Sequence, residues 1–183
     1  MKQKCKKTAA ALLAGLLVTQ GVTAQELTGD VRLACEAILC LSSSVRPGEC
    51  DPSLNRYYGI NKRKWSDTVS ARHAFLNLCP TASADSNMQS LVTAIANGAG
   101  RCDANALNAS LNTSGNDDRS YISNTLPSYC RAWFGHSYTD MQGVMPVYVG
   151  EPAKGGFWVE PQNYNAALKT YNERLRQAAR WSD

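Results

Sequence analysis

Few side chains of this sequence are placed to carry out catalysis. The chain has two histidines, His73 and His136, and neither belongs to a paired spacing that binds zinc. It also has no Gly-x-Ser-x-Gly or Ser-x-x-Lys motif that would mark an activated serine. Glu36 could serve as the general acid of a peptidoglycan-cleaving enzyme, but the apolar residues around it at 34–38 indicate a polar position on an amphipathic helix. We therefore expect no catalytic residue, no bound metal and no cofactor.

Cysteine is the residue type that offers the most chemistry, and the N-terminal segment decides which chemistry that is. Four lysines precede an uncharged run over residues 8–18, and small residues follow at 22–24. This is the pattern of a secretory signal peptide over residues 1–24, and its apolar run is shorter than the roughly 20 residues that span a membrane. Cleavage after Ala24 removes Cys5 and leaves six of the seven cysteines. An even number in an exported chain predicts three structural disulfides.

The spacing of these six cysteines favours disulfides over zinc or redox-active thiols, since no pair has the two-residue spacing of such motifs. Cys35 and Cys40 share an expected helix, where five positions give an axial rise of about 7.5 Å, beyond the usual ~4.4–6.8 Å between bridged Cα atoms. A turn after this helix can return Cys50 to Cys40, and Cys35 then faces Cys79 at the end of a later helix. The proposed pairs are Cys40–Cys50, Cys35–Cys79 and Cys102–Cys130.

The elements that hold these cysteines are expected to be mostly helices. Apolar residues at helical spacing, with proline and glycine at the ends, predict helices over 30–41, 54–60, 65–78, 85–96, 103–111 and 127–135. Asp30 can cap the first of these helices. The composition of residues 112–120 predicts a loop.

The period of the pattern changes near the C-terminus. Residues 147–149 and 157–159 alternate around a turn at 151–155, which predicts a β-hairpin. A lone hairpin is marginal in water, so it needs the final amphipathic helix, whose apolar stripe runs from Tyr164 to Ala179. The expected fold is therefore mainly α: a disulfide-stapled helical domain with one small β-hairpin before a C-terminal helix, in a single domain with one core over 25–183.

The charge of the chain excludes a simple electrostatic mode of nucleic-acid binding. The full sequence has a formal net charge of +4, but four of its 19 basic residues and none of its 15 acidic residues lie in the leader. The exported chain is therefore neutral, and we expect no direct binding to DNA.

Two surface features are candidates for partner binding. Lys62, Arg63 and Lys64 lie near the start of a helix, where the macrodipole disfavours cations by about 0.3–1 kcal/mol each. The alternative is a solvated basic turn with the following tryptophan in the core. Tyr148 and Trp158 share one face of the expected hairpin and could form an exposed aromatic surface, unless the final helix covers them.

Several segments together resemble the TrbM/KikA family of conjugal-transfer proteins. They include LTGDVRLACEAILCLSS at 27–43, PGEC at 47–50, KWSD at 64–67, FLNLCP at 75–80, TLP at 125–127, YVG at 148–150 and GGFWV at 155–159. Shorter matches lie at 53–54, 56–58, 71–72 and 129–130. The resemblance covers nearly the whole exported chain. It implies an accessory protein of mating-pair formation that is associated with type IV secretion in a Gram-negative envelope, and it brings no catalytic motif to transfer.

Three classes of function follow from these observations. The first is a non-enzymatic periplasmic assembly or binding factor whose partners are other conjugation components of the cell envelope. The second is a cell-wall hydrolase that opens peptidoglycan for the secretion channel. The third is a secreted toxin or exclusion factor that acts on neighbouring cells. The resemblance, the disulfide frame and the lack of a catalytic constellation favour the first class.

Overall fold

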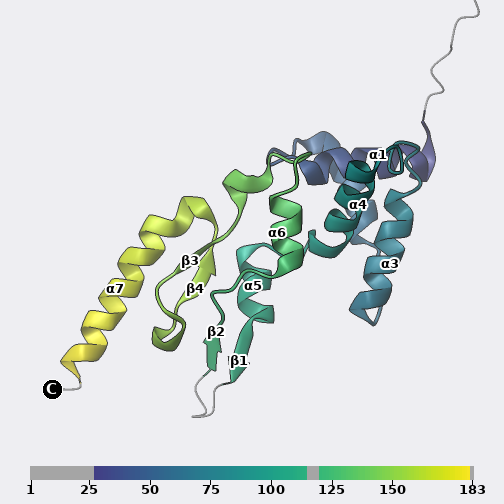
Figure 1. The fold of residues 1–183 in the computed structure, drawn as a ribbon. Helices are drawn as coiled ribbons and strands as arrows, with labels where there is room; N and C mark the ends of the chain where they lie inside the picture. Colours follow the sequence, from purple (N-terminus) through teal and green to yellow (C-terminus); the bar gives the residue numbers. More distant parts are fainter. Residues whose placement is uncertain (1–26, 115–119, 182–183) are drawn as a thin grey trace, which may run out of the picture.

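Helices carry most of the described chain (Figure 1). The structure, a computed structural model, describes residues 27–114 and 120–181, and the expected signal peptide at 1–24 lies outside these residues. The helices of the described ranges are α1 (Gly29–Ser42), α2 (Asp51–Tyr58), α3 (Trp65–Leu76), α4 (Ser86–Gly98), α5 (Ala104–Ser110), α6 (Ser128–Phe134) and α7 (Tyr164–Arg180). The expectation of a mainly helical fold is confirmed, and each helix expected from the apolar spacing is present with its ends shifted by a few residues.

The helices group by their place in the sequence. Figure 1 shows α1, α3 and α4 at one end of the molecule, α7 at the other end, and α5 and α6 between them. α1 forms because its buried residues recur at helical spacing: Ala34, Ala37, Ile38 and Leu41. They pack into the main core together with fully buried side chains of α2 to α5, which include Tyr57, Leu76, Ile95 and Leu107.

The start of α1 differs from the sequence expectation. Asp30 does not cap the helix: the N-cap is Thr28, which makes no side-chain capping hydrogen bond. Asp30 lies in the first turn and instead accepts two hydrogen bonds from Arg56 of α2, at 3.0 Å from Nε and 2.7 Å from Nη2. The carboxylate therefore joins two helices rather than satisfying the end of its own.

Three disulfides join the same pairs that the cysteine spacing suggests. Cys35–Cys79 links α1 to the segment after α3, and Cys40–Cys50 closes the loop between α1 and α2. Cys102–Cys130 links the loop before α5 to α6. All three bonds lie in the part of the described chain that precedes the C-terminal hairpin.

Two antiparallel hairpins are present in the described chain, whereas the sequence pattern predicts one. The expected hairpin pairs β3 (Val147–Val149) with β4 (Phe157–Val159). A second hairpin pairs β1 (Asn112–Ser114) with β2 (Ser120–Ile122), so the prediction of a loop over 112–120 is wrong at both ends of that range. Its residues are mostly polar and exposed, and so they carry no alternating apolar pattern that would have revealed a strand.

A small second core attaches α7 to the C-terminal hairpin, whereas the sequence predicts one core. Val149, Val159 and Tyr171 are its buried members. Gly150 makes this approach possible, since it has φ +80° and an added Cβ would lie 2.2 Å from the Tyr171 ring. The Tyr171 hydroxyl accepts a hydrogen bond from the backbone N–H of Glu151 at 3.0 Å. The final helix thus covers the aliphatic face of the hairpin, as expected from its apolar stripe.

Candidate functional site

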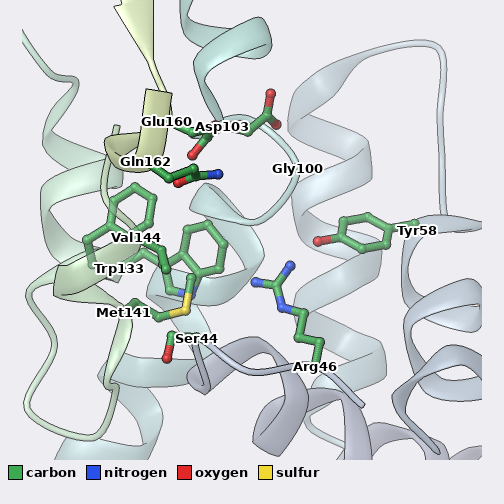
Figure 2. A pocket seen from close by; sticks show the side chains of 11 residues that line it. Ser44, Arg46, Tyr58, Gly100, Asp103, Trp133, Met141, Val144, Glu160 and Gln162 are labelled. Atoms are coloured by element: carbon green, nitrogen blue, oxygen red, sulfur yellow. The ribbon is translucent and has the colours of Figure 1, made fainter. Parts of the chain in front are cut away.

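A cleft of about 340 Å³ brings together segments that are far apart in the sequence. It lies among the loop after α1, the end of α2, the loop before α5, the end of α6 and the segment after β4. Its lining residues, drawn in Figure 2, are Ser44, Arg46, Tyr58, Gly100, Asp103, Trp133, Phe134, Met141, Val144, Glu160 and Gln162.

One wall of the cleft is apolar and firmly held. Trp133 and Phe134 stack with their ring centroids 5.1 Å apart. Met141 and Val144, at the two ends of a short 3-10 turn, lie beside the indole (Figure 2). Trp133 Nε1 donates a hydrogen bond to the Leu41 carbonyl at 2.9 Å, which fixes the indole against the end of α1. Trp133, Phe134 and Met141 are only 3–4% exposed, and Val144 is half-buried, so the wall is fixed by the core and shows little of its surface to the cleft.

The opposite side presents two hydrogen-bond donors. Arg46 Nε donates to the Cys40 carbonyl at 3.2 Å, but within residues 27–114 and 120–181 its two terminal nitrogens have no hydrogen-bond acceptor and the side chain forms no ion pair. The Tyr58 hydroxyl likewise has no hydrogen-bond partner within those ranges. Figure 2 shows the guanidinium and the hydroxyl pointing toward the middle of the cleft.

Tyr58 remains a donor at neutral pH. Burial raises the pKa of its hydroxyl above the ordinary value of 10.0, and nearby Asp103 adds to this rise. Arg46 and Arg72 act in the opposite direction but do not reverse it. Because the phenol stays protonated, it can donate to an anionic group that Arg46 attracts.

Two carboxylates line a third side of the cleft. Asp103 Oδ1 accepts a hydrogen bond from the Ala106 N–H at 2.9 Å, and Glu160 Oε1 accepts one from the Ala104 N–H at 2.8 Å. Both side chains are thus held at the first turn of α5. Each uses one oxygen in these bonds, and the other oxygen has no partner in the described part of the chain. The cleft therefore contains charges of both signs that are not neutralised by ion pairs with each other.

Covalent bonds and one carboxylate hold the cleft in shape. Ser44 and Arg46 lie inside the loop that Cys40–Cys50 closes. Cys102–Cys130 joins the residue before Asp103 to the helix that ends in Trp133 and Phe134. At the rim, Asp140 accepts a hydrogen bond from the Ser44 N–H, while its own N–H donates to the Ser42 carbonyl at 3.1 Å.

The basic segment expected to bind a partner lies outside this cleft. Lys62, Arg63 and Lys64 are exposed just before α3. The backbone of Lys62 is fixed, because its N–H donates to Thr68 Oγ1 at 2.9 Å. Lys62 also borders a separate hollow of about 460 Å³. The tryptophan that follows, Trp65, is half-buried, and the guanidinium groups of Arg72 and Arg101 lie 5.2 Å and 4.8 Å from its ring centroid.

The aromatic pair of the hairpin is not a free surface, and the expectation of an exposed aromatic face at Tyr148 and Trp158 is wrong. Trp158 is only 6% exposed, and its Nε1 donates to the Ser123 carbonyl at 2.9 Å. Tyr148 packs edge-on against it, with ring centroids 5.2 Å apart, and its hydroxyl donates to the Ile122 carbonyl at 2.6 Å. The strand β2 and the residue after it cover this face, while α7 covers the other.

Glu36 and the two histidines are not brought together. Glu36 forms an ion pair with Arg32 one turn earlier on α1, and its Oε2 is buried without a hydrogen-bond partner in the described chain. His73 contacts Asn77, and His136 Nε2 lies 2.8 Å from the Ser90 hydroxyl. None of the three lines the cleft.

The described residues contain neither a metal-binding cluster nor a membrane-spanning helix. Among residues 27–114 and 120–181, no three side chains of His, Cys, Asp or Glu gather so that they could hold a metal ion. Over the same ranges, no helix is long and apolar enough to cross a membrane.

Comparison with known proteins places this chain in a family. The helical fold, the three disulfides and the mixed-charge cleft together describe a class of structure, but they do not indicate an activity. The family model named TrbM matches residues 26–172, and the chain therefore belongs to the TrbM family. This membership makes it a conjugal-transfer-related protein. The comparison with curated proteins and the comparison with solved structures give no match.

The residues of the cleft were not found by reasoning from the sequence. Arg46, Asp103 and Glu160 belong to no motif, and the segment at 56–58 that resembles the TrbM family gives Tyr58 no role. These residues line one cleft only through the packing of separate elements. One signal was present for Arg46, since the proposed Cys40–Cys50 bond encloses it in a short constrained loop.

Proposed function

We propose that the protein is an exported, non-enzymatic accessory factor of conjugal DNA transfer that supports mating-pair assembly and type IV secretion in the periplasm. The observation that carries this proposal is the TrbM match, which extends over residues 26–172. Its partners are other envelope components of the transfer apparatus.

Export to an oxidising compartment is supported by two independent features. Residues 1–24 have the residue pattern expected of a secretory signal peptide, and the structure has three disulfides. Fractionation of a donor cell, combined with alkylation of free thiols before lysis, tests this part of the proposal. We expect the protein in the periplasmic fraction with all six remaining cysteines protected, and a cytoplasmic protein with reactive thiols would contradict it.

A binding role is supported by the chemistry of the cleft, where donors, carboxylates and aromatic rings line one hollow. The test is a donor strain from which the gene is deleted. Complementation with the full chain in the donor should restore the conjugation frequency, and a chain without residues 1–24 should not. Expression of the protein in the recipient alone should leave the conjugation frequency unchanged. An exclusion factor or a toxin would act on the recipient and lower that frequency.

The wall-hydrolase alternative has one specific observation in its favour, the buried and unpartnered Oε2 of Glu36. Zymography of the purified exported chain on peptidoglycan tests it directly. We expect no clearing, and we expect Glu36→Gln to leave the conjugation frequency unchanged. If the wild type cleared peptidoglycan and Glu36→Gln abolished both clearing and transfer while remaining folded and exported, the hydrolase would replace the accessory factor.

A further inference from the structure

The geometry points to the cleft around Arg46 and Trp133 as a binding site for a short peptide segment that carries an acidic group and a basic group on either side of an apolar side chain. This inference goes beyond the role in transfer, since it concerns what the purified chain recognises.

The mixture of charges in the cleft selects the class of ligand. Arg46 offers a cation that has no ion pair among residues 27–114 and 120–181, whereas Asp103 and Glu160 offer two carboxylates. A phosphate, a nucleic acid or an anionic lipid headgroup would meet these carboxylates and be repelled. A neutral glycan would leave the charges unpaired and desolvated. A peptide supplies both signs of charge within one small ligand.

The donor side of the cleft fits a carboxylate. A guanidinium with both terminal nitrogens free can bind a carboxylate through two parallel hydrogen bonds. The Tyr58 hydroxyl points to the same space and can donate a third. Nε is already committed to the Cys40 carbonyl, so the guanidinium is oriented before any ligand arrives.

The acidic side and the apolar wall fit the remaining parts of such a peptide. The second oxygens of Asp103 and Glu160 can accept hydrogen bonds from an ammonium or guanidinium group. Between the two polar sides, the half-buried Val144 and the edges of Trp133 and Met141 leave a small apolar surface, which fits one short apolar side chain.

The site is preorganised by bonds that lie next to it. Cys40–Cys50 restrains the loop of Arg46, and Cys102–Cys130 restrains Asp103 relative to α6. The third bond, Cys35–Cys79, borders none of the lining residues. Restraint of a site before binding lowers the entropy that binding has to overcome.

Isothermal titration calorimetry of the oxidised chain without its leader tests the proposal with three synthetic probes. The first is acetyl-Glu-Leu-Lys-amide, which resembles a segment inside a protein, and the second is Ala-Leu-Ala with free termini, which resembles a short free peptide. The third is acetyl-Gln-Leu-Gln-amide, a neutral control. We expect at least one charged probe to bind and the neutral probe to bind much more weakly. The charged probe that binds more tightly identifies whether an internal segment or a free peptide is preferred.

Substitutions then locate the binding. Three substitutions remove one charge each from the cleft and can keep the positioning hydrogen bonds: Arg46→Gln, Asp103→Asn and Glu160→Gln. Each should weaken binding of the charged probe by roughly tenfold. Lys169→Gln and Asp67→Asn, which change exposed charges outside the cleft, should leave the binding unchanged. Replacing Cys40 and Cys50 together by serine should weaken binding more than the same change at Cys35 and Cys79.

Two results overturn the proposal. One is that no charged probe binds to the folded wild-type protein at millimolar concentration. The other is that a probe binds but the three cleft substitutions have no more effect than the two controls. Both results are independent of the transfer assay, so peptide binding can fail while the role in conjugation stands, and the reverse also holds.

Discussion

Arg72 shows how a single buried cation is accommodated without an ion pair in the described chain. It is 5% exposed, and it donates from Nε to the Ile60 carbonyl and from Nη1 to the Ala99 carbonyl, both at 3.1 Å. The rings of Tyr57, Tyr58 and Trp65 surround its guanidinium, with centroids 4.8, 5.5 and 5.2 Å away. A planar, weakly hydrated guanidinium suits such a site better than an ammonium does.

We therefore predict that Arg72→Met lowers the free energy of unfolding by about 2–4 kcal/mol, because two carbonyls lose their donor and the cation–π contacts disappear. Urea denaturation measures this change. Arg101→Met is the matched control. The guanidinium of Arg101 lies over two aromatic rings, but it donates no side-chain hydrogen bond in the described chain. It should cost about 1 kcal/mol, and equal losses for the two variants would show that the carbonyl contacts of Arg72 are unimportant.

At the scale of elements, the disulfides differ in the length of chain that they close. Cys35–Cys79 spans 44 positions and Cys40–Cys50 spans 10. If the bonds act by restricting the unfolded chain, their contributions are about 4 and about 2.7 kcal/mol. The paired replacement of Cys35 and Cys79 by serine should therefore destabilise the protein more than that of Cys40 and Cys50, as measured by thermal unfolding of the oxidised proteins. The opposite order would mean that native-state contacts around Cys40 outweigh the loop length.

The contact between α1 and α2 should depend on pH. The hydrogen bonds from Arg56 hold the pKa of the Asp30 carboxyl below its ordinary value of 3.8. A carboxyl whose pKa is lowered by folding stabilises the protein above the pKa of the unfolded chain, and this stabilisation is lost as the pH falls through the folded pKa.

The difference in urea midpoint between the wild type and Asp30→Asn should therefore be present at pH 6 and disappear near pH 2. Arg56→Gln should reproduce the loss at pH 6, and the double variant should add little to either. A difference that persists unchanged at pH 2 would show that the carboxylate charge is not what matters.

The elements themselves were largely predictable, and their packing was not. Helices such as α1 and α7 follow from apolar residues at helical spacing, and the β3–β4 hairpin follows from its alternation. The burial of Trp158 depends instead on Ser123, which is 35 positions away, within a polar stretch that gives no strand signal. The same is true of the cleft, because Arg46 and Glu160 line one hollow although they are more than a hundred positions apart in the sequence.

At the scale of the whole molecule, exposed charge gathers in separate places. Lys62, Arg63 and Lys64 lie at the α3 end, and a basic stripe of Lys169, Arg176 and Arg180 lies on α7 at the other end. The first set lies wholly within the TrbM match, whereas two members of the second set lie beyond residue 172.

We predict that reversing the charge of Lys62, Arg63 and Lys64 to glutamate lowers the conjugation frequency, since a partner surface would lose its basic groups. Export and thermal stability should be nearly unchanged, because exposed charges usually contribute within about 0.5 kcal/mol. The same reversal at Lys169, Arg176 and Arg180 controls for the change in net charge. If both triple variants transferred equally well, the basic segment before α3 would be only a solvated turn.

The connectivity of the disulfides constrains the order in which they can be made. If the chain is exported N-terminus first, as we propose, Cys35 and Cys40 reach an oxidase before Cys50 or Cys79 has emerged. Cys35 and Cys40 are not bonded to each other in the structure, and both lie within α1. Either α1 must form early enough to hold the two thiols apart, or a premature bond must be reshuffled by an isomerase. We predict that reshuffling takes place, so the yield of correctly oxidised protein should fall in a strain that lacks disulfide isomerase. Replacing Cys35 and Cys79 together by serine should remove that dependence.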